Sequence, residues 1–439
     1  MAGPSGSARS ATPVSVGAGS CANAAGLAGG TDAVAGVAVG AAAGPAGESG
    51  VAGASSGAAA EPAVVPMWRS SFPAMGTRVD LIGWGGNGMA IVNAIVEVVA
   101  RHEDMWSVFR VSSEVSRLNA AVASAGGGEG VSRHLAESAE ASAGLVVSED
   151  TDRLLRGALA LAEATGGAFN PMIGPLVAAW DVKAMRAAYV AGAPLPPAPS
   201  SRVVEAALRA SSWGLLSRVG ERRWAVGVPA ESVGGVDAPS PRLDLGGIAK
   251  GYTADACRDL AVSMGARGVL VSVGTSSVSV SGTRADGSPW RAGLRDPHGV
   301  PTAIAGVVEL PADGMASLST SGDNLGPLGD ARALCAGPVS ERVSERVAER
   351  AADLRARETP GGGGRIFDHH IIDPRTGYPA RSGVRQVSVV ASSGVLAEAL
   401  STALLVDPSI DVSDVAARWA RAMGAPASAK VVGLVRAER

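Results

Sequence analysis

A short stretch, DHHIIDPRTGYPA at residues 368–380, concentrates groups that could carry acid–base chemistry. It holds two of the five histidines of the chain, two aspartates and an arginine. Adjacent His369 and His370 point to different sides of an extended segment, so they are poor candidates for binding one metal together. The Asp-Pro and Thr-Gly pairs indicate a tight turn. A histidine held beside that turn could act as an acid or base, or the stretch could be a solvated hairpin; the stretch alone leaves both open.

A second candidate is LDLGGIAKGY at residues 243–252. A glycine pair between a strand and a helix lets backbone N–H groups approach a phosphate, and Lys250 adds positive charge in the first turn of the expected helix. The segment is not a Walker loop, because its lysine precedes the glycine and Tyr252 stands where that motif has serine or threonine. A phosphate site and an ordinary strand-to-helix turn both remain open here.

The third candidate is AEALST at residues 397–402, at the start of an expected helix. Glu398 and Thr402 are four residues apart and therefore share one helix face. A carboxylate and a hydroxyl are hard oxygen ligands that could supply part of a Mg²⁺ coordination shell. The same pair also occurs on ordinary helix surfaces, so the spacing does not decide between the two.

A fourth motif, GWGGNG at residues 83–88, matches the dinucleotide-binding pattern G-x-G-x-x-G literally. In that fold an acidic residue follows the second strand. Here Glu103 and Asp104, at about the right distance, still belong to the helix that follows the glycines. In a chain with 59 glycines a chance match is common. We therefore interpret the segment as a glycine-rich hairpin or connection.

Composition excludes several classes of protein. The net charge is −3, which argues against nucleic acid as the main partner, because binding to phosphates normally requires a basic excess. Cys21, Cys257 and Cys335 are sparse and far apart, so they predict neither a disulfide framework nor a zinc site. No stretch of eighteen or more strongly apolar residues predicts a transmembrane segment.

The chain divides into an expected disordered extension, residues 1–66, and one domain over residues 67–439. The extension is rich in glycine, alanine and serine and has only four charged residues, so it cannot bury enough apolar surface to offset its ordering entropy. Residues 331–365 are expected to form a mobile insertion with a surface helix. Because a basic start and a leucine-rich run are lacking, we expect a cytoplasmic location, with an extracytoplasmic one left open.

The spacing of apolar residues predicts a mixture of strands and helices. The expected strands cover residues 77–82, 242–245, 268–282 and 385–392. The expected helices cover residues 89–106, 112–120, 148–165, 203–212, 249–266 and 394–406. Ser148 is expected to cap the third of these helices. No regular βαβ repeat is present, which favours the α+β class over a doubly wound sheet.

Eight segments in a fixed order together resemble the FAD:protein FMN transferases, the ApbE family. They are MGT (75–77), SVFRVSSEVSRLN (107–119), GGAFNPMIGPLVAAWD (166–181), LDLGGIAKGYTAD (243–255), GSPWRAGLRDP (287–297), STSGDN (319–324), HIIDPRTGYP (370–379) and AEALST (397–402). The resemblance runs from about residue 68 to about residue 435 without the insertion. It implies a T-fold-like α+β domain that binds FAD in a cleft with Mg²⁺. Such enzymes move FMN from FAD onto a threonine or serine hydroxyl of a target protein and release AMP.

The resemblance also implies three groups of site residues. Met75, Phe109, Ala168, Phe169, Asn170, Asp244, Lys250 and Ile371 match FAD contacts. His370 matches the histidine of the family signature and would be the base, while Thr320 and Ser321 would donate hydrogen bonds to the phosphate. Gly247, through its carbonyl, and Glu398 and Thr402, through their side chains, match the Mg²⁺ ligands. Asp373 and Arg375 are expected to hold the turn in shape, with His369 as a bystander.

The chain departs from the family pattern at four places. Glu398 and Asn170 stand where aspartate is usual, Gly274-Thr275-Ser276 replaces Gly-Gly-Asn, and Phe109 lacks the hydroxyl of the usual tyrosine. The extra methylene of Glu398 shifts a carboxylate next to an ion that tolerates little deviation from octahedral geometry. Two alternatives to a transferase therefore remain, a flavin-binding protein without transfer activity and an FAD pyrophosphatase in which water replaces the protein hydroxyl. The sequence does not identify the acceptor protein.

Overall fold

The computed structural model describes residues 37–38, 66–126, 144–191, 196–229, 239–297, 303–311, 315–322 and 370–436. The expected disordered extension, except for three of its residues, and the expected insertion at residues 331–365 lie outside the described residues. None of the helices in the described ranges is long and apolar enough to cross a bilayer.

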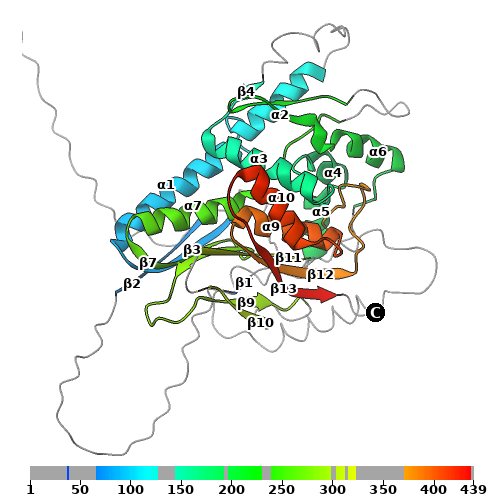
Figure 1. The fold of residues 1–439 in the computed structure, drawn as a ribbon. Coiled ribbons are helices and arrows are strands. Elements are labelled where there is room, and N and C mark those ends of the chain that lie inside the picture. Colours follow the sequence, from blue (N-terminus) through cyan, green and yellow to red (C-terminus); the bar gives the residue numbers. More distant parts are fainter. Residues whose placement is uncertain are drawn as a thin grey trace, which may run out of the picture.

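A seven-stranded sheet forms the centre of the domain (Figure 1). Its strand order is β13-β12-β11-β8-β7-β3-β2, and each neighbouring pair is antiparallel. An antiparallel sheet with helices gathered on one face is an α+β architecture, which confirms the predicted class. The strands are β2 (Met67–Ala74), β3 (Thr77–Gly85), β7 (Ala266–Val273), β8 (Ser277–Gly282), β11 (Met315–Gly322), β12 (Val384–Ala391) and β13 (Ala429–Arg436).

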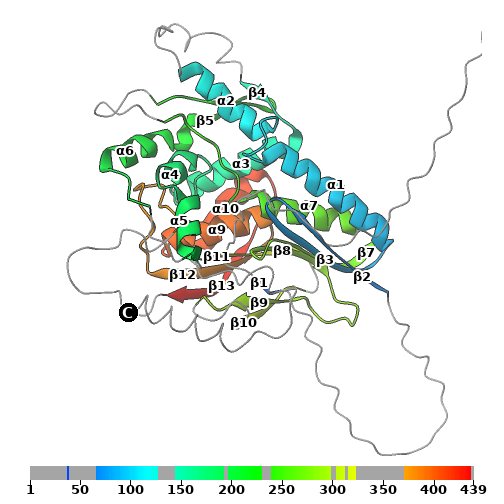
Figure 2. The same cartoon turned by 180° about the vertical axis from the view of Figure 1, so that it is seen from behind.

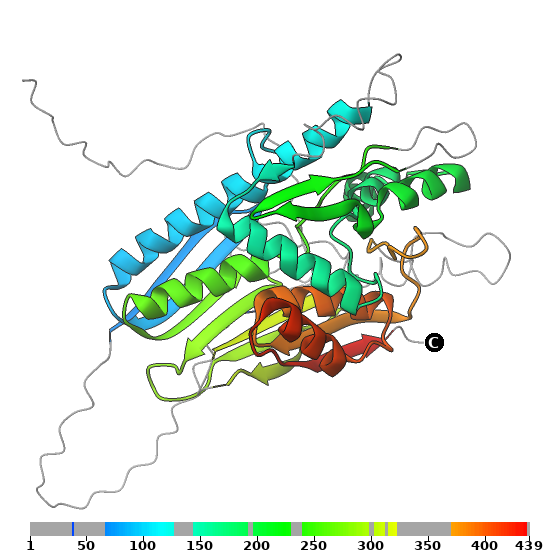
Figure 3. The same ribbon diagram turned by 45° about the horizontal axis from the view of Figure 1, so that its top comes forward.

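Three helices lie side by side over one face of this sheet: α1 (Gly88–Trp106), α7 (Ala249–Ser263) and α9 (Gly394–Val406). Figure 3 shows them as the blue, yellow-green and orange ribbons above the strands. Every residue of α9 except Thr402 is buried, because this helix lies between the sheet and the outer helices α3 (Glu149–Ala164) and α10 (Val412–Met423). A helix with apolar residues on every side is typical of such an enclosed position.

The opposite face of the sheet is covered by a small sheet of three strands in the order β1-β9-β10 (Figure 2). Its strands are β1 (Val37–Ala38), β9 (Arg291–Arg295) and β10 (Ile304–Glu309). Val278 and Val280 of β8 pack there against Trp290 and Leu294. The serines that alternate with these valines face α7 and α9, so β8 has an apolar face and a polar face.

The remaining elements form a unit beside the ends of α3 and α9. It contains α2 (Glu114–Gly126), α4 (Gly174–Ala179), α5 (Val182–Ala191), α6 (Ser201–Ala210) and the 3₁₀ helix η1 (Trp213–Leu215). It also contains the sheet β4-β6-β5, made of β4 (Leu145–Val146), β6 (Arg223–Val226) and β5 (Leu216–Gly220). The segment that connects α3 to α5 forms one wall of the site described below.

Most of the helices predicted from periodicity are confirmed. The helix predicted at residues 394–406 has those bounds, and the one predicted at residues 148–165 is α3, where Ser148 Oγ accepts a hydrogen bond from Thr151 N. Residues 112–120 lead into α2, with Ser113 Oγ accepting from Ser116 N at 2.9 Å. Side-chain caps and apolar spacing are local signals, and they predicted these helices correctly.

Two strand predictions need correction. Residues 268–282 form two strands rather than one, because the chain reverses at Gly274, whose φ of +67° favours glycine. Residues 242–245 form no strand. The side-chain amide of Asn119 instead binds both backbone groups of Leu243, donating to its carbonyl at 3.1 Å and accepting from its N–H at 2.7 Å. The amide thus supplies the two backbone hydrogen bonds that a neighbouring strand would otherwise provide at Leu243.

The GWGGNG motif is a strand-to-helix connection, as interpreted, and its glycines make room for an indole ring. A Cβ added to Gly83 would lie 2.3 Å from the ring of Trp68, and one added to Gly88 would lie 2.6 Å from it. Trp68 Nε1 donates to the carbonyl of Gly85 at 3.1 Å. Asn87 caps α1 by accepting from Ala90 N at 3.2 Å. The motif therefore packs against a side chain of its own chain.

Helices α7 and α9 cross where two glycines meet. A Cβ on Gly251 would lie 2.4 Å from the carbonyl oxygen of Gly394, and a Cβ on Gly394 would lie 2.3 Å from that of Gly251. Asp255 of α7 fixes the crossing, because its Oδ2 accepts from Gly394 N at 2.6 Å. The close contact brings the start of α7 next to the first turns of α9 and so determines which side chains can meet there.

We expect Gly251→Ala to lower the free energy of unfolding by about 1–3 kcal/mol, because the methyl group would overlap backbone atoms that cannot move away alone. Urea unfolding measures the difference. Gly306→Ala is the matched control, because a Cβ at Gly306 would meet nothing within 4 Å. Equal unfolding midpoints for the two variants would contradict the prediction.

Candidate active site

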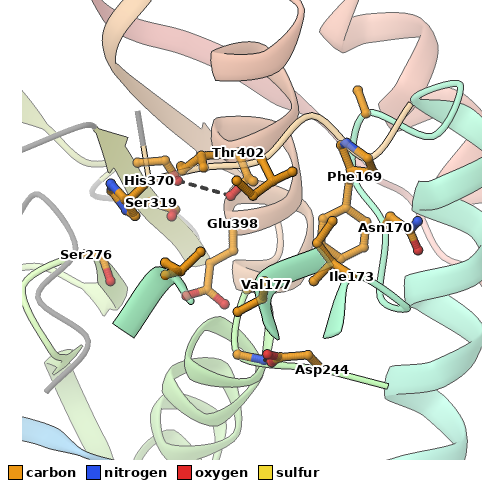
Figure 4. A pocket seen from close by; sticks show the side chains of 18 of the residues that line it. Phe169, Asn170, Ile173, Val177, Asp244, Ser276, Ser319, His370, Glu398 and Thr402 are labelled. Atoms are coloured by element: carbon orange, nitrogen blue, oxygen red, sulfur yellow. Dashed lines mark hydrogen bonds between the residues drawn. The ribbon is translucent and has the colours of Figure 1, made fainter. Parts of the chain in front are cut away.

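A cavity of about 250 Å³ lies where α4, α5, α7, α9, β11 and the turn after His370 come together. Figure 4 shows Phe169 and Ile173 on one side and Ser319 and His370 on the other, with the side chains of α9 between them. One wall is thus largely apolar and the opposite wall is polar. Ligand pockets in proteins commonly combine an apolar surface with a few convergent polar groups.

The cavity gathers most of the residues predicted from sequence. Three predicted residues do not line it, and they are considered below. Those that line it are Ala168, Phe169, Asn170, Asp244, Gly247, Lys250, Ser321, His370, Ile371, Glu398 and Thr402. They come from segments up to about 230 residues apart in the chain. The structure therefore places them together, while their individual roles stay predictions.

Thr320, Met75 and Phe109 lie outside this cavity. Thr320 is fully buried on the opposite face of β11, where its hydroxyl lies 2.8 Å from that of Ser388. Its neighbours Ser319 and Ser321 face the cavity because side chains alternate along a strand. Met75 packs in a tight turn with φ +52°, and Phe109 is 78% exposed in the turn after α1.

Residues that sequence reasoning did not select also line the cavity. Ser319 could have been found from the alternation, since it shares the face of Ser321. Ile173, Val177, Val182 and Arg186 form the wall from α4 and α5. No local signal marks the three apolar residues, because an apolar helix face looks the same in the sequence whether it meets a core or a cavity. Arg186 lies outside the motifs.

Glu398 and Thr402 occupy successive turns of α9 and both face the cavity, as their spacing predicted. The Glu398 carboxylate is only 5% exposed. Its Oε2 accepts from Gly251 N at 2.7 Å and its Oε1 accepts from the Ser277 hydroxyl. Burial raises the pKa of Glu398, although the charge of Lys250 and these two hydrogen bonds act in the opposite direction. A buried carboxylate of this kind favours a nearby cation.

The chain before α7 forms a tight turn at the edge of the cavity. Asp244 Oδ1 accepts from Gly246 N at 2.8 Å, and Asp244 N donates to the carbonyl of Pro171 at 2.8 Å. Lys250 Nζ donates to the carbonyl of Gly246 at 2.9 Å, and this side chain is 8% exposed. Asp244 and Lys250 are therefore held by the backbone of one turn, which fixes both relative to α9.

The side-chain amide of Asn170 joins two backbone segments behind the cavity wall. Its Nδ2 donates to the carbonyl of Ser211 at 2.7 Å, and its Oδ1 accepts from Met172 N at 2.8 Å. An aspartate could accept from Met172 but could not donate to Ser211. The departure from the usual aspartate therefore matches the local hydrogen bonding of this chain.

We expect Asn170→Asp to lower the free energy of unfolding by about 1–3 kcal/mol, because a buried carboxylate oxygen would face the Ser211 carbonyl. Chemical denaturation with far-UV circular dichroism is the measurement. In the control variant Asn87→Asp the side chain only accepts a hydrogen bond at a helix N-terminus, where aspartate serves equally well. A loss of stability in Asn87→Asp as large as in Asn170→Asp would refute this account.

The turn after His370 is rigid. Asp373 N donates to the carbonyl of Tyr378 at 2.8 Å, and Gly377 N donates to that of Asp373 at 2.9 Å. Arg375 pairs with Asp373 at 3.1 Å and with Asp407 at 2.9 Å, and both partners raise its pKa. Asp373 and Arg375 thus hold the turn, as expected. His370 itself is partly buried and lines the cavity.

The donors that face the cavity fit Mg²⁺. Among the described residues no group of three His, Cys, Asp or Glu side chains could hold a metal. Glu398, Thr402 and Gly247, the residues predicted to bind the cation through a carboxylate, a hydroxyl and a carbonyl, all line the cavity. These are hard oxygen donors, and Mg²⁺ prefers such donors while keeping waters or substrate phosphates in its other positions.

Known proteins with similar sequences identify the family of this chain. The model of the ApbE family matches residues 75–327 and 350–424, so the chain belongs to the ApbE family. A protein of Treponema pallidum named FAD:protein FMN transferase is 32% identical over 272 residues, which cover 60% of this chain and 62% of that protein. A protein of Vibrio cholerae with the same name is 25% identical over 344 residues, covering 76% of this chain and 80% of that one. The chain thus spans just under two thirds of the Treponema relative.

Solved structures show the same fold. The flavin transferase ApbE from Vibrio cholerae superimposes with a TM-score of 0.56 at 22% identity and covers 85% of this chain and 98% of its own. The ApbE protein from Thermotoga maritima superimposes with a TM-score of 0.55 at 26% identity, and the match covers 85% of this chain and 97% of that protein.

Proposed function

We propose that the protein transfers FMN from FAD to a serine or threonine hydroxyl of an acceptor protein and releases AMP, with Mg²⁺ as cofactor. The observation that carries this proposal is the single cavity in which His370, Lys250, Glu398 and Thr402 meet beside the ring of Phe169. A base, a cation and hard oxygen donors are what transfer of a phosphoryl-linked group to a hydroxyl requires. The names of the relatives in the same family support the reaction.

FAD would lie only partly in the cavity. At about 250 Å³ the cavity is smaller than typical pockets for compact ligands, which begin at about 300 Å³, and FAD is larger than most of these. The polar side chains and the predicted metal donors indicate that the diphosphate occupies it. The flavin and adenine rings would then extend along the apolar wall and beyond the opening.

In the proposed reaction His370 accepts the proton of the acceptor hydroxyl. The hydroxyl oxygen forms a bond with the phosphorus atom of the FMN part, and the bond from that phosphorus to the bridging oxygen breaks. AMP leaves with the electron pair of the broken bond. A serine or threonine hydroxyl is a weak nucleophile at neutral pH, so a positioned base is needed. The rigid turn at Asp373 holds His370 for this task.

Other side chains of the cavity would stabilise charge on the diphosphate. Lys250 supplies a fixed positive charge, and the hydroxyls of Ser319 and Ser321 face the same space. When bound, Mg²⁺ would neutralise negative charge on the phosphate oxygens. Glu398, Thr402 and the Gly247 carbonyl would hold it.

The test is to incubate the purified protein with FAD, MgCl₂ and a small acceptor domain from the same source. We expect the intact mass of the acceptor to increase by one FMN group, with one AMP released per acceptor modified. Chelation with EDTA should abolish both products. AMP release without modification of any acceptor domain would show that water is the nucleophile. Binding of FAD with neither product would show a flavin-binding protein.

A further inference from the structure

One basic side chain that lines the cavity has no role in the proposed reaction. It is Arg186 of α5, which lies one helical turn after Val182, another residue of the same wall. Ile173 and Val177 of α4 continue this wall. Among the lining residues that α4 and α5 contribute, Arg186 is therefore the one basic residue on an otherwise apolar wall.

The position of Arg186 is fixed by its neighbours in the chain. The preceding residue, Met185, is 2% exposed and packs in a cluster with Leu176 and Trp180. Asp181 Oδ1 accepts from Ala184 N at 3.2 Å at the start of the helix. With Met185 buried on one side, the helix geometry directs the next residue to the adjacent face, where the cavity lies. A binding group on such an anchored helix is better oriented than one on a loop.

The charges around the cavity show why a second cation matters. Lys250 Nζ is bound to the carbonyl of Gly246, and its charge acts on the buried Glu398 carboxylate. Asp244 adds a further negative charge to the lining. Without Arg186, the two carboxylates and the one ammonium group would leave the side chains of the lining net negative before any metal ion binds. Arg186 offsets this charge, and a guanidinium can bind two phosphate oxygens at once.

We propose that Arg186 binds the diphosphate of FAD and thereby selects flavins and adenine nucleotides that carry a diphosphate over riboflavin and adenosine. This inference rests on the proposed function, because it assumes that the cavity holds FAD. It differs from the metal site and from the base, since Arg186 acts on affinity and ligand choice rather than on the transfer of the proton.

Equilibrium titration of the full chain with FAD, ADP, riboflavin and adenosine tests the proposal. We expect Arg186→Gln to weaken binding of FAD and ADP by about 10- to 100-fold, the usual worth of a charge-assisted contact, and to change binding of riboflavin and adenosine less than about 2-fold. Arg186→Lys should recover part of the affinity, because it keeps the charge and loses the two-pronged contact. Lys183→Gln is the matched control, because Lys183 is exposed on the same helix and does not line the cavity.

Each other result overturns the inference in a distinguishable way. Equal losses for FAD and riboflavin would show that the substitution disturbs α5 itself. Unchanged FAD affinity in Arg186→Gln would remove Arg186 from the site but leave the transferase proposal intact. A wild-type protein that binds neither FAD nor ADP would overturn the proposed function, and this inference with it.

Discussion

Replacing His370 by alanine is expected to lower the rate of FMN transfer by about 10²- to 10⁴-fold, the usual contribution of a positioned general base. Binding of FAD should change little, because the charges that meet the diphosphate belong to other residues. Transfer is followed by the mass of the acceptor, and FAD affinity by titration. The combination of lost transfer and retained binding distinguishes a base from a residue that only supports the cavity.

Tyr378→Phe provides the control for this variant. Tyr378 belongs to the same turn, is 41% exposed and packs edge to face against Trp180. Removal of its hydroxyl should leave both transfer and binding within about 2-fold, as expected for a surface group away from the chemistry. If His370→Ala keeps more than about a tenth of the wild-type transfer rate, His370 is not the base.

The second large effect is expected at Glu398. Glu398→Gln keeps the size of the side chain and its capacity for hydrogen bonds with Gly251 N and the Ser277 hydroxyl, so the fold should persist. Loss of the negative charge removes a ligand from the predicted cation site. We expect the Mg²⁺ concentration for half-maximal transfer to rise by about 100-fold or more, since Mg²⁺ depends on carboxylate ligands. Direct titration of Mg²⁺ by calorimetry checks this without relying on turnover.

Glu398→Asp tests whether the departure from the usual aspartate is adapted to this chain. In the structure the longer side chain reaches both Gly251 N and Ser277. A shorter carboxylate would leave at least one of these buried groups without its partner, at a typical penalty of about 1–3 kcal/mol. We therefore expect lower stability and lower turnover. Higher turnover in Glu398→Asp would instead show that glutamate weakens the enzyme.

The sequence predicted those parts of the site that depend on short spacings. Glu398 and Thr402 were assigned to one helix face from their separation alone, and α9 places both in the cavity. The turn after His370 followed from its proline and glycine, and the pairing of Arg375 with Asp373 agrees. Caps and turns act within a few residues, so local reasoning can find them.

Features that depend on distant partners could not be predicted in this way. Residues 242–245 form no strand because Asn119, more than a hundred residues earlier, binds Leu243. Thr320 was predicted to face the phosphate and Ser319 was not considered, because a motif shows which residues are present but not which face of the strand meets the cavity. Arg186 stands in a helix that the motifs do not include. In each case a partner distant in the sequence determines the conformation or the place of the residue, and the pattern of neighbouring residues does not reveal that partner.

The place of α9 in the chain also determines when the site can exist during protein synthesis. His370 is translated 120 residues after Lys250, and Glu398 follows later still. At about 5–20 residues per second, a growing chain has only the earlier half of the cavity for roughly 6–24 s. During this interval the crossing of α7 and α9 at Gly251 is missing, and the side of α7 that packs against α9 has no cover. An unfinished chain would therefore lack the predicted base and both side-chain metal donors, while its exposed apolar surface would make it a substrate for chaperones.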